Sequence, residues 1–326
     1  MKREIFIIIL FFMFISITPP LQATERTAHI GMIAFDTPFL AACKGLKAGM
    51  AEQGFVEGRD IVFSEYNVEK DKSRIPRLVE ELATEKIDLV FTVTTPVVLR
   101  IRQPAEKHNI PIIFTVVADP VGAGLVSSLR HPETMSGISH IAFELVPRRL
   151  LLFKEAFPFL KKVAVFHDPA QKGLSRNNDN PELQAAANEA GVELVEFHIH
   201  NKEEMTRACA EITNRMVDGI LMLPDTLSVA FFDQLVALSR REKLPMMVID
   251  NMMLAKGGVM GYSPDFYDVG FQAAAMVKSV LDGVDPGNLP VQNPDKVKLE
   301  VSMKEVNRLG LAISPDFLIK ADEIIR

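Results

Sequence analysis

Short apolar runs of strand length alternate with amphipathic stretches along most of this chain. The clearest example is 87–117, where apolar runs at 87–93 and 111–117 enclose a predicted helix that begins at Pro96 and ends near His108. Two buried strands joined by a helix run parallel, so their carboxyl ends share one edge of the sheet. Open α/β sheets bind ligands at that edge. The pattern therefore predicts a ligand site before any side-chain chemistry is considered.

The same strand–helix–strand unit recurs in the second half of the chain. The run 217–223 is apolar and opens, like 87–93, with a β-branched residue followed by aspartate, and 244–250 corresponds to 110–119. The distance along the chain between the two units is too long for the repeat of a solenoid protein. It predicts two similar α/β lobes, and a chance resemblance between two ordinary units is the alternative.

Strands alternate with helices throughout, which predicts an α/β fold with parallel sheets in two Rossmann-like lobes joined by a hinge. The first lobe is expected to contain 24–143 plus about 259–290, and the second about 144–258 plus about 291–326. This division assumes that the chain crosses back near 259. Near its end, 315–325 is predicted as a helix.

The amino-terminal segment is not expected to be part of the folded protein. Lys2 and Arg3 precede an apolar run at 5–17, and Ala23 provides a small residue at a cleavage point. These features are typical of a signal peptide covering 1–23, which predicts export to the periplasm. An uncleaved membrane anchor is the alternative, although the run is shorter than the ~20 apolar residues of a spanning helix.

Composition and charge exclude some classes of protein and of binding partner. The chain has 326 residues, of which 48% are hydrophobic and 24% charged, and its formal net charge is −6. This composition excludes global disorder, and the acidic balance argues against a nucleic-acid partner. Cys43 and Cys209 fall in different predicted lobes within helical patterns, so two free, buried thiols are expected rather than a disulfide.

Polar residues gather where the predicted strands end. Threonines that begin helices can bind an anion such as a carboxylate, and aspartates can bind an ammonium group or sugar hydroxyls. Aromatic rings nearby would form flat apolar walls. Each aspartate or threonine alone could be an ordinary helix cap. The candidate ligand-binding residues are Phe35, Asp36, Thr94, Thr95, Asp119, Asp225, Thr226, Asp250 and Tyr262.

The sequence has no G-x-S-x-G, P-loop or G-x-G-x-x-G motif, so no catalytic residues and no cofactor are expected. His198 and His200 could face the same side of a strand, as metal ligands do. Alternate exposed histidines at a strand edge are the favoured interpretation, so no metal is expected.

Several segments resemble a known family. The stretch GLKAGMAEQGFVEG at 45–58, the block ADPVGAGL at 118–125 and the tripeptide at 136–138 are similar to substrate-binding proteins of bacterial ABC importers, in a family with tryptophan- and tyrosine-binding members. The resemblance covers nearly the whole chain after the signal segment. It implies the type I periplasmic binding protein fold, with the ligand held between the lobes. Thr94 and Thr95 match the family's loop before the helix, and Asp119 and Asp225 match its cleft aspartates.

This resemblance implies an exported, monomeric binding protein rather than an enzyme. It would capture a small polar ligand, with an amino acid (aromatic ones included) as the leading candidate, and deliver it to the membrane permease of an ABC importer. A ligand-binding module for a membrane sensor is one alternative. An exported α/β hydrolase is another, disfavoured by the missing nucleophile and base.

Overall fold

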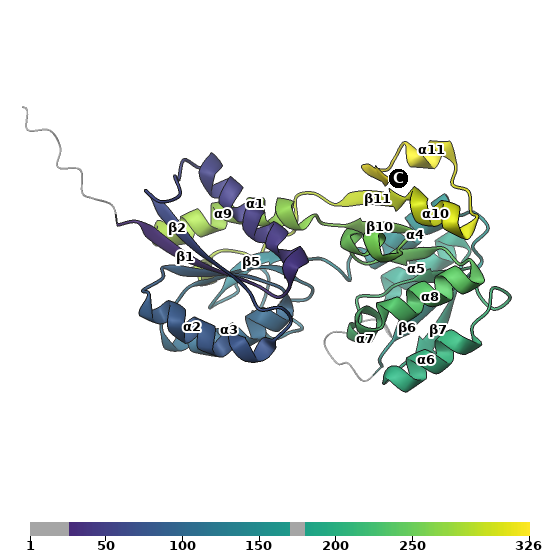
Figure 1. Cartoon of the computed structure of the whole chain (residues 1–326), viewed down its shortest axis with the longest axis horizontal. Helices are drawn as coiled ribbons and strands as arrows, with labels where there is room; N and C mark the ends of the chain where they lie inside the picture. The colour runs from purple at the N-terminus through teal and green to yellow at the C-terminus, as the bar shows by residue number, and fades with distance from the viewer. Residues whose placement is uncertain (1–25, 170–179) are drawn as a thin grey trace, which may run out of the picture.

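The computed structural model describes residues 26–169 and 180–326, which form two α/β lobes lying side by side (Figure 1). The predicted signal peptide, 1–23, lies outside these residues. Within the described ranges, no helix is both long and apolar enough to cross a membrane.

The first lobe is a five-stranded parallel sheet. Its strands, in spatial order, are β2 (Ile61–Asn67), β1 (Ala28–Ala34), β3 (Leu89–Val93), β4 (Ile112–Val117) and β5 (Ser136–Ser139). Alternate residues of β1 serve opposite faces: Ile30 and Met32 pack under one pair of helices and Ile33 under the other. This period of two is the normal pleat of a strand buried on both faces. The helices are α1 (Leu40–Glu52) and α9 (Phe266–Leu281) on one face, and α2 (Ile75–Thr84) and α3 (Thr95–Lys107) on the other (Figure 1).

The second lobe contains a seven-stranded sheet that is parallel except between β10 and β11. Its strands, in spatial order, are β12 (Glu323–Ile325), β11 (Lys298–Ser302), β10 (Met260–Ser263), β9 (Met246–Val248), β8 (Gly219–Leu221), β6 (Lys162–His167) and β7 (Glu193–His198). One face is covered by α4 (Val146–Ala156), α5 (Pro181–Ala190), α10 (Met303–Leu309) and α11 (Pro315–Leu318). The other face is covered by α6 (Lys202–Glu211) and α8 (Phe232–Glu242), with the short α7 (Thr226–Ala230) before α8.

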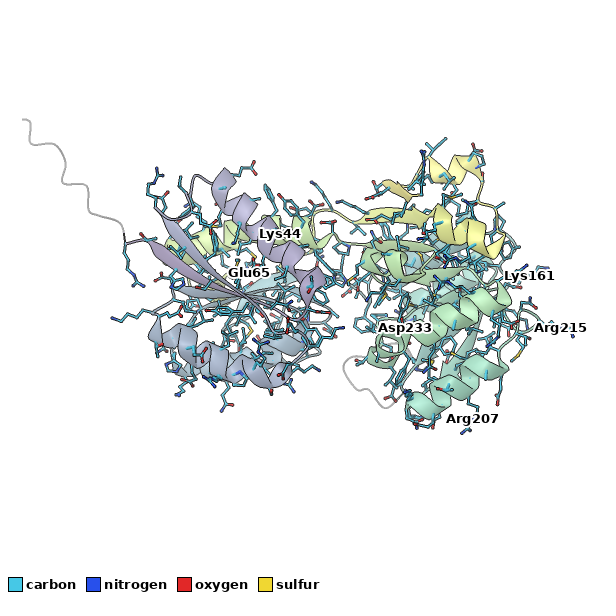
Figure 2. All side chains as sticks on the ribbon, viewed as in Figure 1. Lys44, Glu65, Lys161, Arg207, Arg215 and Asp233 are labelled. Atoms are coloured by element: carbon cyan, nitrogen blue, oxygen red, sulfur yellow. The ribbon has the colours of Figure 1, made fainter. Side chains whose placement is uncertain are left out.

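Charged side chains point outward from the helices of both lobes. Figure 2 shows Lys44 on α1, Arg207 on α6 and Asp233 on α8, and all three are exposed. The buried faces of the same helices are apolar, as the amphipathic pattern of the sequence predicted. Both lobes therefore obtain their stability from cores on the two faces of a central sheet.

The two lobes repeat one structural device. Asp88, just before β3, accepts a hydrogen bond from the backbone N–H of His29 at the start of β1 (2.8 Å). Asp218, just before β8, accepts from the N–H groups of Lys161 and Lys162 at the start of β6 (2.8 Å each). In each lobe, the aspartate that opens the repeated unit aligns its strand with the lobe's first strand. This shared role argues against a chance resemblance between the two units.

Within residues 26–169 and 180–326, the chain passes between the lobes three times, after Ser139, after Ser263 and after Gln292. The second crossing differs from the expected boundary near 259. Met260 and Gly261 pair with β9 and with β11, so β10 belongs to the second sheet and the chain returns only with α9. Several connecting segments restrict the relative motion of two lobes to a hinge.

The predicted helix over 315–325 is wrong in its second half. The helix ends at Leu318, and Glu323–Ile325 forms β12, parallel to β11. Asp322 precedes this strand, and its side chain accepts a hydrogen bond from the N–H of Leu299 (2.7 Å). A free edge of β11 and two adjacent isoleucines therefore favour a strand over another helical turn.

Cys43 and Cys209 are free and buried, one in each lobe, as expected. Burial raises the pKa of the Cys43 thiol to about 12 and that of Cys209 to about 11. Both thiols are therefore protonated at neutral pH, which makes them poor nucleophiles and metal ligands.

The return of α9 to the first lobe depends on glycine contacts with α1. A Cβ on Gly270 would lie 1.9 Å from the carbonyl oxygen of Ala42, and one on Gly45 would lie 2.0 Å from that of Tyr267. Only glycine allows two backbones to approach this closely. The α1–α9 contact therefore holds the second crossing segment against the first lobe.

We expect Gly270→Ala to lower the free energy of unfolding by about 1–3 kcal/mol, because the added methyl overpacks the α1–α9 contact. The better helix propensity of alanine, worth about 1 kcal/mol, opposes this loss and is outweighed. Ala275→Ser adds one heavy atom at an exposed position of the same helix and should change stability by less than ~0.5 kcal/mol. Urea denaturation followed by far-ultraviolet circular dichroism measures both, and equal midpoints would contradict this account.

Candidate functional site

Three β-branched residues with positive φ lie at one edge of the first sheet. Thr94 follows β3 with φ 84°, Val116 is the last residue but one of β4 with φ 57°, and Ile141 lies just after β5 with φ 45°. All three are β-branched, and such residues rarely adopt positive φ. Their strands are neighbours, so the strained residues gather at the carboxyl edge of the sheet. Strain of this kind costs about 1–3 kcal/mol per residue and clusters at binding sites.

Thr94 is the most informative of the three. It occupies the N-cap position of α3, yet its side chain makes no capping hydrogen bond. Its hydroxyl oxygen is buried and has no partner among the described residues. Thr95, the first residue of the helix, is half-buried beside it. The helix α3 has 13 residues. A buried, unpaired hydroxyl group at the amino terminus of such a helix is an arrangement that an anionic ligand would complete.

The other candidates of the first lobe lie at the ends of neighbouring strands. Asp119 follows β4, is buried, and accepts a hydrogen bond from the N–H of Gly122 (2.8 Å). Phe35 and Asp36 follow β1, and both are half-buried. The strand order β1–β3–β4 therefore brings Phe35, Asp36, Thr94, Thr95 and Asp119 to one edge.

Asp36 is held in its ionised form. Burial raises the pKa of its carboxyl, but the hydrogen bond from Thr37 and the ammonium of Lys70 (3.2 Å) outweigh burial and lower it. Lys256, which belongs to the second lobe, lowers it further. The charge of Asp36 therefore faces both its own lobe and the opposite one.

Asp225 and Thr226 follow β8 in the second lobe, as the sequence predicted for that strand end. Asp225 is buried and caps α7: one carboxylate oxygen accepts from the N–H groups of Leu227 (2.9 Å) and Ser228 (3.1 Å). Its other oxygen accepts from the N–H of Asp168 (3.1 Å). Thr226 is exposed. The carboxylate of Asp225 thus joins Asp168, just after β6, to the start of α7.

Asp250 connects the two lobes. It follows β9, and its carboxylate contacts the imidazole Nε2 of His140 at 2.6 Å, in the segment where the chain first leaves the first lobe. Burial raises the pKa of Asp250, but the charge and hydrogen bond of His140 and the charge of Arg149 outweigh it and lower the pKa. The His140 ring also packs on Phe266 at 5.8 Å, at the second crossing.

Arg149 holds the hinge together from within. It lies on α4, is fully buried, and donates from all three guanidinium nitrogens to backbone carbonyls: Tyr262 (2.9 Å), Ala142 (2.8 Å) and Ile249 (2.8 Å). The carbonyl of Tyr262 belongs to β10, just before the second crossing, and that of Ala142 belongs to the first crossing segment. The carbonyl of Ile249 lies at the end of β9. Burial lowers the pKa of Arg149 to about 10, opposed by Asp250, so the group remains charged at neutral pH.

Tyr262 lies on β10 and is half-buried, with its ring packed against the core of the second lobe. The candidates therefore form two groups, one at the strand ends of each lobe, and the His140–Asp250 contact lies between the groups. Neither of the two surface cavities described contains any candidate residue. The larger, about 500 Å³, lies on the outside of the first lobe between α1, α9 and residues 292–296.

Arg149 and His140 are not among the residues that the sequence predicted for the site. A signal for Arg149 was present, since it lies three residues after Val146 and four before Phe153, both buried on the apolar face of α4. A charge on an apolar helix face requires a buried partner. His140 had no local signal, because its partner is 110 residues away.

Two α/β lobes, three connecting segments and polar strand ends in both lobes define a two-lobed binding protein of the periplasmic type. Residues 31–325 match the model of the family described as ABC transporter substrate binding protein, and the chain belongs to that family. The family consists of substrate-binding proteins, so this chain is a binding protein and not an enzyme.

Known relatives agree with this assignment. A tyrosine-binding protein from Clostridioides difficile (strain R20291) is 26% identical over 286 residues, covering 86% of this chain and 81% of the relative. An ABC domain in complex with L-Trp from Streptococcus pneumonia has a TM-score of 0.74 at 24% identity, covering 92% of this chain and 100% of that one. The ligand-free, open structure of a substrate-binding protein with adhesive properties from Clostridium difficile has a TM-score of 0.69 at 22% identity, covering 92% and 99%. The expected type I periplasmic binding protein fold is confirmed.

We expect Arg149→Met to lower the free energy of unfolding by about 3–5 kcal/mol, because three buried carbonyls lose their donor and Asp250 loses a compensating charge. Arg148→Met changes the exposed neighbouring arginine and should be nearly neutral. Urea denaturation of both variants gives the comparison. A similar loss in the two would mean that the guanidinium contacts of Arg149 contribute little.

Proposed function

We propose that this protein captures an aromatic amino acid of the tryptophan or tyrosine kind between its lobes and delivers it to the permease of an ABC importer. The observation that carries the proposal is Thr94, held at φ 84° with an unpaired buried hydroxyl at the start of α3. A relative described as a tyrosine-binding protein and a structural neighbour in complex with L-Trp support the ligand class.

An amino acid needs an anion site and a cation site at a short separation. In our proposal its carboxylate binds Thr94 and Thr95, where the free N–H groups of the first turn of α3 and the helix dipole favour negative charge. Its ammonium group binds Asp119, on the neighbouring strand end, or Asp225, in the opposite lobe. A ligand that contacts both lobes favours the closed form, because it binds that form better.

The remaining candidates would surround the side chain and the outer rim of the ligand. Phe35 and Tyr262 offer one aromatic ring from each lobe, which suits stacking against a planar side chain. Asp36, Thr226 and Asp250 would form the polar rim. Asp250 already contacts His140 at 2.6 Å, so in our proposal it responds to lobe position as well as to ligand.

Export follows from the same proposal. A binding protein that serves an importer works outside the cytoplasmic membrane, in agreement with the signal peptide expected at 1–23 and cleaved near Ala23. We propose that the mature protein is a periplasmic monomer whose closed, liganded form docks on the permease.

We expect L-tryptophan and L-tyrosine to bind in calorimetry, and Thr94→Gly and Asp119→Ala to weaken binding by about 10- to 200-fold, because a hydrogen bond to a charged group is worth about 1.5–3 kcal/mol. Glycine is unstrained at φ 84°, so Thr94→Gly should lose affinity without a matching loss of stability. The chain contains three tyrosines but no tryptophan, so with excitation at a wavelength that tyrosine does not absorb, the fluorescence of L-tryptophan can be followed without background from the protein.

Two matched controls accompany these variants. Asn109→Gly also relieves a positive φ (53°), at the exposed end of α3 far along the helix from Thr94, and Asp60→Ala removes an aspartate that accepts from Val56 and Arg59 at the start of β2. Both should bind like the unmodified protein. Unchanged affinity in Thr94→Gly and Asp119→Ala would reject the amino-acid site, and binding of a sugar in place of amino acids would change the ligand class.

We further expect saturating L-tryptophan to reduce the radius of gyration measured by small-angle X-ray scattering, because a ligand held by both lobes closes them about the hinge. D-glucose at the same concentration serves as the control and should leave the radius unchanged. An unchanged radius with bound L-tryptophan would place the ligand on one lobe alone.

A further inference from the structure

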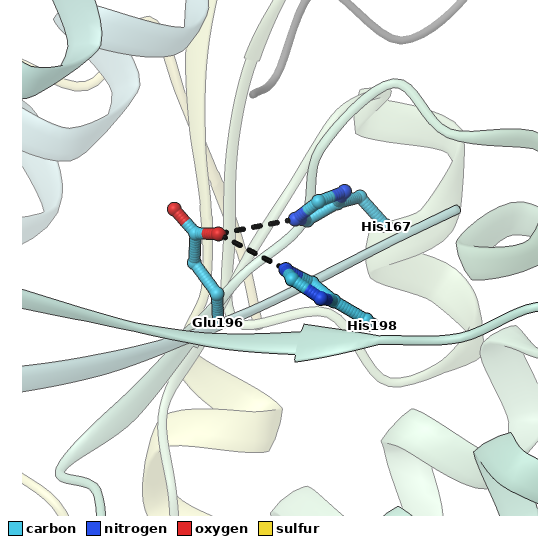
Figure 3. A group of neighbouring side chains, drawn as sticks. All are labelled: His167, Glu196 and His198. Atoms are coloured by element: carbon cyan, nitrogen blue, oxygen red, sulfur yellow. Dashed lines mark hydrogen bonds and ion pairs between the residues drawn. The ribbon is translucent and has the colours of Figure 1, made fainter. Parts of the chain in front are cut away.

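A second cluster of ligand-type side chains lies away from the proposed amino-acid site. His167 ends β6, and Glu196 and His198 lie two residues apart on one face of β7, the outer strand of the second sheet. Figure 3 shows both imidazoles pointing at the same carboxylate oxygen of Glu196. The sequence suggested His198 with His200, but His200 lies beyond the strand and contacts Asp168 at 3.1 Å.

The spacing of the three side chains is that of metal ligands. The Nε2 atoms of His167 and His198 lie 3.4 Å and 3.3 Å from the shared Glu196 oxygen, and all three donor atoms lie within 4.8 Å of one another. These distances exceed the usual 2.7–3.2 Å of a hydrogen bond. Zinc bonds of about 2.0–2.1 Å in a tetrahedral site separate neighbouring ligand atoms by about 3.4 Å.

The environment of the cluster agrees with a site that has one open position. The His167 side chain is 1% exposed, whereas Glu196 and His198 are about half exposed, so solvent has access from one side. The register of the parallel strands pairs His167 directly with His198, which keeps the two rings together. The Nδ1 atom of His167 is buried without a partner among the described residues. A metal bound to Nε2 would fix the imidazole proton on Nδ1, and thereby the tautomer of His167.

We propose that His167, Glu196 and His198 bind one divalent transition-metal ion, with Zn²⁺ as the first choice and water as the fourth ligand. Two imidazoles and one carboxylate suit Zn²⁺, whereas Ca²⁺ and Mg²⁺ prefer all-oxygen sites. Cu²⁺ binds such donors at least as tightly, so availability decides which ion is held. The ion would join the edge strand β7 to β6 and stabilise the second lobe. This inference is independent of the amino-acid site.

The test uses the whole chain purified without a histidine tag. Calorimetry with Zn²⁺ should give one site per chain, and His198→Ala and Glu196→Gln, both at exposed positions that folding tolerates, should each weaken it at least ~10-fold. His200→Ala removes a neighbouring exposed histidine outside the cluster and should bind like the unmodified protein. Zn²⁺ in large excess should also raise the Tm by about 5 °C or more, an effect lost in His198→Ala.

Co²⁺ provides a second readout that depends on geometry. The unmodified protein and His200→Ala should show the intense visible absorption of tetrahedral Co²⁺, and His198→Ala should not. Mg²⁺ should leave this spectrum and the Tm unchanged. The proposal is overturned if Zn²⁺ does not saturate at one ion per chain, if His198→Ala and Glu196→Gln bind it as the unmodified protein does, or if His200→Ala loses as much affinity as they do.

Discussion

The arrangement of the two lobes depends on one buried guanidinium. Arg149 donates to three carbonyls that come from the first crossing segment, from β10 and from the end of β9, and its charge faces Asp250. A buried charge persists only when its hydrogen bonds are satisfied, so these backbone segments must stay in place around it. The hinge is therefore organised by a fixed centre inside the second lobe, and the crossing segments bend around that centre.

The first lobe contributes a different constraint. Thr94, Val116 and Ile141 hold strained conformations at adjacent strand ends, and the close α1–α9 contact holds two helices together on one face of the same sheet. A tightly packed sheet offsets strain at its edge, whereas an isolated loop would relax. The stable core thus maintains an edge where the hydroxyl of Thr94 is buried at the amino terminus of α3.

Between these two parts, His140 and Asp250 form a contact that belongs to neither lobe alone. The imidazole is on the chain leaving the first lobe, and the carboxylate ends a strand of the second. This contact therefore joins the first crossing segment to a strand end of the second sheet. The sequence predicted a ligand contact for this aspartate, and the structure shows its carboxylate in contact with His140, where it joins the lobes.

Most of the architecture followed from the sequence, because strand and helix periods are local and the repeated unit marks each lobe. The strand ends carrying Thr94, Asp119 and Asp225 could be recognised in the same way. The tertiary structure alone decided that β10 joins the second sheet, that the tail forms β12, and that His167 rather than His200 accompanies His198. It also decided that Arg149 is the centre of the hinge. Each of these depends on pairing between residues far apart in the chain, and hydrophobic periodicity contains no information about which distant partner a strand or a buried charge will meet.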